Sequence, residues 1–199
     1  MLKKAPFLFP VILLMNVLMV HGQGIVDQQT RPPSFGEAYY VIQSYSPIGQ
    51  SFTPGSNSVG YVSLYLADEN PGNGLGATLY VDLRSGSITG PILSSSALVS
   101  MTDSSGGAAN FFFPTAVPVT PGTTYYFDVN VQSGDHWAID GAISGYAGGS
   151  EFLNGMANPD NSLWFQEGVV VPEPAVVWLA LAGGGVFFCI RRWRKSPEL

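Results

Sequence analysis

Hydrophobic and polar residues alternate over short stretches in the middle of the chain, which is the pattern of strands with one buried and one exposed face. In the clearest stretch, residues 123–131, the inward positions are Tyr125, Phe127, Val129 and Val131. Gly, Pro, Asn and Ser separate these stretches, and no segment before residue 175 has a helical period. We therefore expect an all-β chain that folds as a single, jelly-roll-like β-sandwich. The segments predicted as strands are 59–66, 78–83, 111–119, 123–131, 137–139, 151–153 and 163–167.

The first 24 residues have the pattern of a secretory signal peptide. Two lysines near the start are followed by an apolar stretch over residues 7–20 and then by small residues. We expect Sec-type export and a mature chain that begins near Gln23 or Ile25. An uncleaved membrane anchor is the alternative, but these 14 residues are short for a hydrocarbon core of about 30 Å.

The C-terminal region, residues 169–199, is predicted to be a sorting signal. Two prolines flank a glutamate, an uncharged apolar span follows over residues 175–190, and a basic cluster over 191–195 comes after it. The span is predicted to be a transmembrane helix with its basic end in the cytoplasm, because positive residues stay on that side. The residues assigned to sorting are Pro172, Glu173, Pro174, Arg191, Arg192 and Arg194.

This order of tripeptide, span and basic cluster closely resembles the PEP-CTERM sorting signal of bacteria. The resemblance implies recognition by a membrane-embedded exosortase, cleavage near the tripeptide, and a Gram-negative-type producer of exopolysaccharide. An unprocessed single-span anchor is the alternative; a eukaryotic lipid-anchor signal is disfavoured because such tails end in their apolar stretch. Cys189, the only cysteine, lies in the span, so the chain cannot form an intramolecular disulfide.

The body is predicted to fold over residues 36–168, after a flexible lead-in at 25–35. Its layout is similar to the galactose-binding-like jelly-roll modules, of the choice-anchor type, that are attached to many exported bacterial proteins. This resemblance implies a surface module without a defined ligand. The segments that carry it are 50–53, 63–66, 79–83, 117–126 and 146–150.

Charge excludes one class of partner. Between residues 25 and 171 only Arg31 and Arg84 are basic, against twelve acidic residues, for a net charge of −10. Such a body repels phosphate backbones, so we expect no nucleic-acid binding.

The sequence also lacks the motifs of common enzymes. The mature body has one histidine, His136, and contains no nucleophile elbow, zinc-protease helix motif or cysteine pair. We therefore expect no enzymatic activity and no cofactor. In a cryptic hydrolase, a histidine-dependent triad would have to use His136, whereas carboxylate pairs could hydrolyse glycosides without histidine. The candidate pairs are Asp68 with Glu69 and Asp135 with Asp140.

Two groups of residues are candidates for ligand contact. Aromatic rings stack on sugars, so Trp137, Tyr146 and Trp164 are possible glycan contacts, although aromatic residues of a sandwich more often belong to its core. A Gly-rich acidic loop is a weak calcium candidate, with a solvated turn as the alternative. The loop residues are Asp68, Glu69, Asn70 and Asn73.

Together these features predict an exported, non-enzymatic protein of the cell surface or extracellular matrix. The C-terminal helix would anchor it in the membrane until an exosortase processes it, and the body would then associate with exopolysaccharide in a biofilm matrix. The alternative function is a carbohydrate-binding module with a defined glycan ligand.

Overall fold

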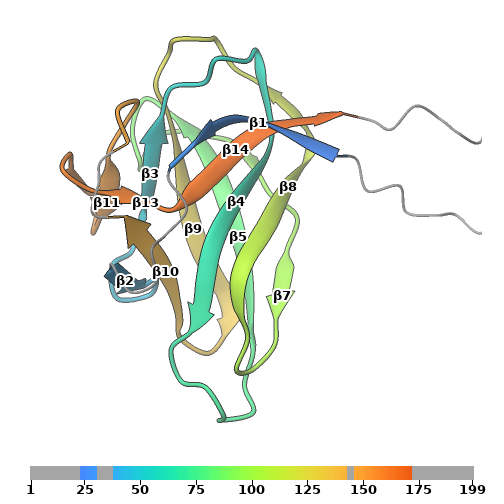
Figure 1. The fold of residues 1–199 in the computed structure, drawn as a ribbon, viewed down its shortest axis with the longest axis vertical. Coiled ribbons are helices and arrows are strands. Elements are labelled where there is room, and N and C mark those ends of the chain that lie inside the picture. The colour runs from blue at the N-terminus through green and yellow to red at the C-terminus, as the bar shows by residue number, and fades with distance from the viewer. Residues whose placement is uncertain (1–22, 31–37, 143–145, 172–199) are drawn as a thin grey trace, which may run out of the picture. The chain divides into compact units, whose positions relative to one another are not determined.

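The computed structural model describes residues 23–30, 38–142 and 146–171. Within these ranges the protein consists of β-strands without helices, and the strands form two antiparallel sheets packed face to face (Figure 1). The predicted all-β sandwich is therefore confirmed. No helix of the described residues is long and apolar enough to cross a membrane. The predicted sorting tripeptide, membrane span and basic cluster lie outside the described residues, and so do residues 1–22 of the predicted signal peptide. The last two residues assigned to that peptide, Gln23 and Gly24, instead begin the first strand.

The first sheet is built around its longest central strand, β4. One edge of β4 pairs with β8, and the other pairs with β14 and β10. β1 then pairs with β14, and β2 and β13 pair with β10. The strands of this sheet are β1 (Gln23–Gln29), β2 (Ala38–Val41), β4 (Ser58–Asp68), β8 (Gly106–Pro118), β10 (Trp137–Ala142), β13 (Ser162–Leu163) and β14 (Phe165–Val171).

The second sheet follows the order β12-β11-β3-β9-β5-β6, and β7 also pairs with β5. Its strands are β3 (Gly49–Phe52), β5 (Ala77–Ser85), β6 (Ile92–Ser95), β7 (Val99–Met101), β9 (Tyr125–Gly134), β11 (Glu151–Leu153) and β12 (Met156–Asn158). β9 and β5 run in register over most of their length and form the middle of this sheet.

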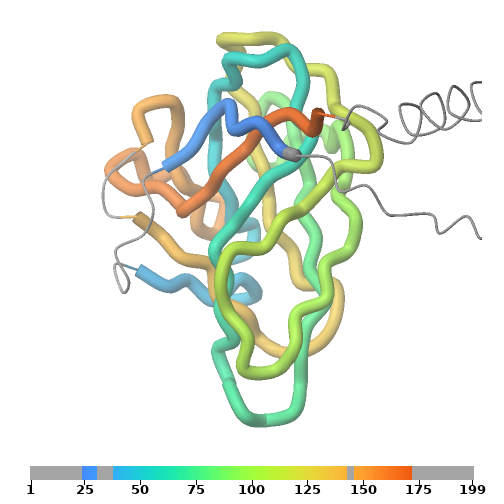
Figure 2. The backbone as a smooth tube through the Cα atoms, turned by 45° about the vertical axis from the view of Figure 1, so that its right-hand side comes forward, coloured from blue at the N-terminus to red at the C-terminus, as the bar shows by residue number. Residues whose placement is uncertain are grey.

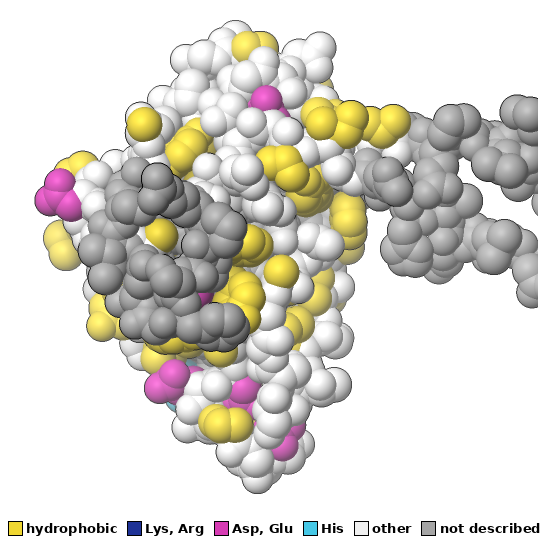
Figure 3. Space-filling view, viewed as in Figure 1, with side chains coloured by type: hydrophobic (Ala, Val, Ile, Leu, Met, Phe, Trp, Pro, Cys, Tyr) yellow, Lys and Arg dark blue, Asp and Glu magenta, His cyan; other side chains and the backbone are white. Residues whose placement is uncertain are grey.

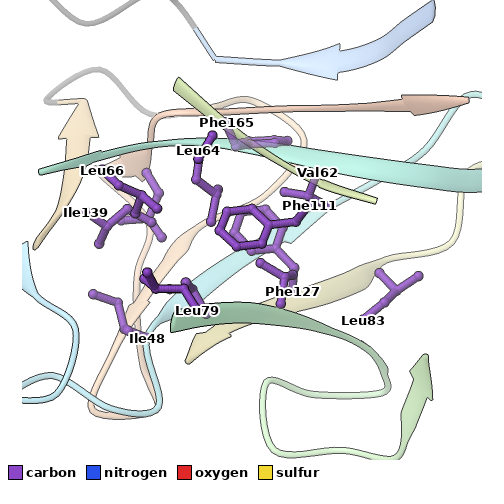
Figure 4. Close-up of a cluster of buried hydrophobic side chains, with 14 of the residues drawn as sticks. Ile48, Val62, Leu64, Leu66, Leu79, Leu83, Phe111, Phe127, Ile139 and Phe165 are labelled. Atoms are coloured by element: carbon purple, nitrogen blue, oxygen red, sulfur yellow. The ribbon is translucent and has the colours of Figure 1, made fainter. Parts of the chain in front are cut away.

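The hydrophobic core lies between the inner faces of the two sheets (Figure 4). Phe127 and Val129 of β9 are fully buried, and Tyr125 and Val131 pack against the core from partly buried positions. The inward face predicted for this segment is therefore confirmed. The rings of Phe127 and Phe165 lie 5.4 Å apart, so they join the two sheets across the core.

The predicted boundaries of the body are corrected at both ends. Residues 25–29 were expected in a flexible lead-in, but they belong to β1, which pairs with β14 from Gln23 opposite Val171 onward. The sandwich also continues to Val171 instead of ending at residue 168. β1 is rich in glutamine, which suits a half-exposed edge strand as well as a linker, so its composition was misleading.

The β1–β14 pair places the two ends of the folded unit side by side, and both strands are seen together in Figures 1 and 2. The loops that close the opposite end of the sandwich connect β4 to β5, β7 to β8, and β9 to β10.

Candidate functional site

The three predicted glycan-contact residues lie in different parts of the fold. Trp137 of β10 is completely buried in the hydrophobic core. Tyr146 is partly buried; its hydroxyl donates a hydrogen bond to Oε1 of Gln28 at 2.8 Å, and its ring stands edge-on to Phe165. Trp164 is buried on the outer face of the first sheet. The structure does not bring these residues together in one site.

Trp164 has aromatic and acidic neighbours on this outer face. Its ring meets that of Tyr65 edge-on at 5.8 Å, and its backbone N–H donates to the carbonyl oxygen of Asp140. Tyr39 pairs with Asp140 from the other side of β10 and is 45% exposed. Burial, followed by the charge of Asp140, raises the pKa of Tyr39. The sequence did not predict Tyr39 as a contact residue, because β2 is too short to show an alternating pattern.

The predicted calcium loop lies at the lower end of the sandwich in Figure 1. Oδ1 of Asp68 accepts a hydrogen bond from the backbone N–H of Asn70, and Oδ2 accepts one from Ser104. The side-chain amides of Asn70 and Asn73 donate to Asp135. Both carboxylates thus hold the loops together, and the described residues contain no group of three acidic, His or Cys side chains arranged for a metal. The geometry is that of a hydrogen-bonded turn.

Asp103 is a further carboxylate in these loops that sequence reasoning missed. It accepts hydrogen bonds from the backbone N–H groups of Gly72 and Gly74, at 2.9 and 3.0 Å. The bond from Gly72 contributes most to lowering the pKa of Asp103. The acidic tip, which we define as Asp68, Glu69, Asp103 and Asp135, is the main gathering of acidic side chains visible in Figure 3.

The only Lys or Arg among the described residues, Arg84, is held in a carboxylate clamp on the outer face of the second sheet. Its Nη2 atom lies 3.2 Å from Oδ2 of both Asp82 and Asp128, and Nη1 donates to the carbonyl oxygen of Gly90. Burial raises the pKa of Asp128, and the charge of Arg84 opposes this effect. The clamp ties the loop after β5 to the sheet, and Ile88 of that loop is buried beneath it.

A second pair of acidic residues lies between β1 and β14, the first and last strands of the sandwich. Glu167 of β14 is fully buried, and no described N–H or hydroxyl donates a hydrogen bond to its carboxyl group. Its neighbour is Asp27 of β1, whose Oδ2 accepts hydrogen bonds from the backbone of Gly55 and Ser56 at 2.7 and 2.8 Å. Burial, followed by the charge of Asp27, raises the pKa of Glu167 to about 8. At neutral pH, the raised pKa keeps Glu167 mainly in its neutral form.

The acids considered for hydrolysis lie in different surroundings. Glu167 is buried beneath the sandwich surface, and Asp140 lies on the sheet face whereas Asp135 lies in the acidic tip. The side chain of His136 is 59% exposed, and its Nδ1 lies 3.9 Å from Oδ1 of Asp135.

No family model matches the chain, and no curated protein is significantly similar to it. The site must therefore be interpreted from its own geometry.

Proposed function

We propose that this protein is exported, anchored in the membrane by its C-terminal span, and processed by an exosortase at Pro172-Glu173-Pro174. After processing, the body joins an exopolysaccharide matrix, where it does not catalyse a reaction. The body in this proposal is a jelly-roll module of the galactose-binding-like type. Its partners are the Sec-type export machinery and a membrane-embedded exosortase.

The observation that carries this proposal is where the folded unit begins and ends. β1 begins at Gln23, one of the two starts predicted for the mature chain, and β14 ends at Val171, directly before the tripeptide. Cleavage before Gln23 and after Val171 would therefore release a complete sandwich, whereas the other predicted start, Ile25, would remove the first two residues of β1. Prolines 172 and 174 also favour an extended backbone beyond the fold, which is the conformation that a protease binds.

The test compares tail processing in a bacterial host that carries a matching exosortase. Wild type should lose the tail, whereas a variant with Pro172, Glu173 and Pro174 all changed to Ala should remain full-length and membrane-bound. Mass spectrometry of the C-terminus and membrane fractionation measure these outcomes. A matched control changes Pro197 and Glu198 to Ala and should be processed like wild type. If wild type and the triple variant both keep residues 175–199, the chain is a plain membrane anchor.

A carbohydrate-binding module is the second candidate function, and the exposed ring of Tyr39 favours it. Tyr39 is paired with Asp140, so its exposed ring offers an apolar face next to a polar group, the combination that stacks on a sugar. A glycan array with residues 23–171 tests this function. A reproducible hit that Tyr39→Ala abolishes and Tyr45→Ala leaves intact would support it, since Tyr45 is exposed elsewhere. The absence of any hit would remove this candidate.

A further inference from the structure

Charged residues are distributed unevenly over the described surface. The acidic tip closes one end of the sandwich (Figure 3). Around the chain ends the strands are uncharged: residues 23–26 and 168–171 contain no charged side chain, and neither does the segment 110–124, which includes most of β8. The nearest acid along β1 is Asp27, which is bound by the backbone of the loop at Gly55.

The uncharged region also exposes large apolar side chains. Val26, Gly168, Tyr61 and Phe112 follow one another across β1, β14, β4 and β8. Tyr61 is buried, but Val26 and Phe112 are 40% and 37% exposed. Ile25 and Val171, whose side chains point to the opposite face of the same strand pair, are 59% and 41% exposed. We call these four exposed residues, Ile25, Val26, Phe112 and Val171, the apolar corner.

The apolar corner lies at the start of the tail. Only residues 172–174 separate Val171 from the uncharged span over 175–190. A fully extended chain advances about 3.6 Å per residue, so residue 175 can lie at most about 14 Å from Val171. If the span is inserted in a bilayer, Val171 is therefore held within about 14 Å of the start of that span.

We propose that the apolar corner rests on the headgroup layer of the membrane that holds the tail, while the acidic tip points away from it. This inference rests on the proposed function, since it requires the membrane-inserted precursor. Apolar side chains gain free energy in the interfacial layer, and acidic groups are repelled by anionic lipids. The described residues of the corner include no cation, so the contact is with the bilayer interface in general and not with a particular anionic lipid.

Fluorescence quenching tests this orientation in the anchored chain. Residues 23–199 are produced in a host without the protease and reconstituted into phosphatidylcholine nanodiscs that contain headgroup spin-labelled lipid. Cys189→Ser removes the native thiol, and a fluorophore is attached at Val26→Cys in the corner or at Glu69→Cys in the acidic tip. The label at position 26 should lose most of its fluorescence, and the label at position 69 should keep it.

A spacer variant tests whether the short connection causes the contact. About 20 Gly and Ser residues inserted between Val171 and Pro172 have a root-mean-square length of roughly 25 Å, enough to release the body. Quenching at position 26 should then fall to the value at position 69. Equal quenching at both positions of the parent chain, or no effect of the spacer, would overturn the proposed orientation.

Alkaline extraction separates this failure from a failure of the proposed function. A chain that resists extraction from membranes but shows no difference between the two labels is inserted in another orientation, so only the inference is wrong. A chain that is extracted has no membrane span, and both the proposed function and the inference are then wrong.

Discussion

At the scale of single residues, the fold depends on acids that are buried without a cation beside them. Glu167 is buried near Asp27, and Glu151 is buried and accepts hydrogen bonds from Tyr40 and Asn158. Burial raises the pKa of both Glu167 and Glu151. A buried carboxyl group that stays protonated avoids the cost of a desolvated charge, so these residues are compatible with the interior mainly in their neutral form.

Glu167 should make the stability of the body depend on pH. The fold raises the pKa of Glu167 from 4.5 to about 8, so the native state holds a proton that the unfolded chain releases between these values. Its stabilising contribution is complete below pH 4.5 and is lost as the pH rises through about 8. The melting temperature of wild type should therefore fall between about pH 5 and pH 9.

Glu167→Gln should flatten this pH dependence, because a glutamine amide does not ionise over this pH range. A shallower decrease should remain, since Glu151 and Asp128 also have raised pKa values. Asp160→Asn, at an exposed carboxylate, serves as the control and should follow wild type. Identical pH profiles for wild type and Glu167→Gln would show that another group holds the proton.

Phe127 should be one of the most sensitive positions of the core. It is fully buried and contacts Phe52 and Phe165, so Phe127→Ala leaves a cavity and should lower the free energy of unfolding by about 3–5 kcal/mol. Urea denaturation of residues 23–171 measures this loss. Tyr126→Ala, on the outer face of the same strand, should cost less. A loss below about 1 kcal/mol for Phe127→Ala would contradict its place in the core.

At the scale of elements, carboxylates hold the loops of the acidic tip in place. Asp103 binds the backbone of Gly72 and Gly74, both of which have positive φ, so it stabilises a turn that glycine adopts readily. Asp68 and Asp135 join the neighbouring loops in the same way. The acids that suggested calcium binding in the sequence therefore have a structural role in the described loops.

Asp103→Ala should loosen the β4–β5 loop without unfolding the sandwich. The amides of Gly72 and Gly74 lose their acceptor, so their hydrogen exchange should become faster, which mass spectrometry of the exchanged protein can measure. Glu69→Ala in the same loop should not change exchange at these glycines, because the side chain of Glu69 is exposed to solvent. Unchanged exchange in Asp103→Ala would mean that other contacts hold the turn.

The sequence predicted several strands well, including the short β11 at residues 151–153, but it placed the start of β8, the longest strand, five residues too late. β4, β5 and β9 alternate over enough residues for one buried face to be recognised, and their positions are confirmed. β1, β2 and β3 are short or glutamine-rich, and their pairing depends on partners far away in the chain. The environment of Trp137 could not be predicted either, because composition does not distinguish a core tryptophan from one on a binding surface.

At the scale of the whole molecule, the sandwich is closed by its first and last strands. Beyond the β1–β14 ladder, Thr30 donates its backbone N–H to the carbonyl of Phe165 at 3.0 Å, and its Oγ1 accepts the N–H of Phe165 at 2.9 Å. β1 is therefore an integral part of the folded body, and the body is the same unit that the two proposed cleavages would release.

Residues 23–171 should fold on their own as a β-protein with one cooperative thermal transition. The shorter segment 36–168 should melt at a lower temperature, because it lacks β1, the bonds of Thr30 and the end of β14. Far-ultraviolet circular dichroism and thermal scans compare the two segments. Equal melting temperatures would show that β1 is dispensable.

The clamp around Arg84 has a consequence for resistance to proteolysis. Proteases of trypsin-like specificity cut only after accessible lysine or arginine, and between residues 23 and 171 the chain contains no lysine and two arginines. The side chain of Arg84 is 17% exposed and is engaged by Asp82 and Asp128. Such an enzyme would have to open the second sheet to cut at Arg84, so this position is protected from digestion for as long as the clamp stays closed.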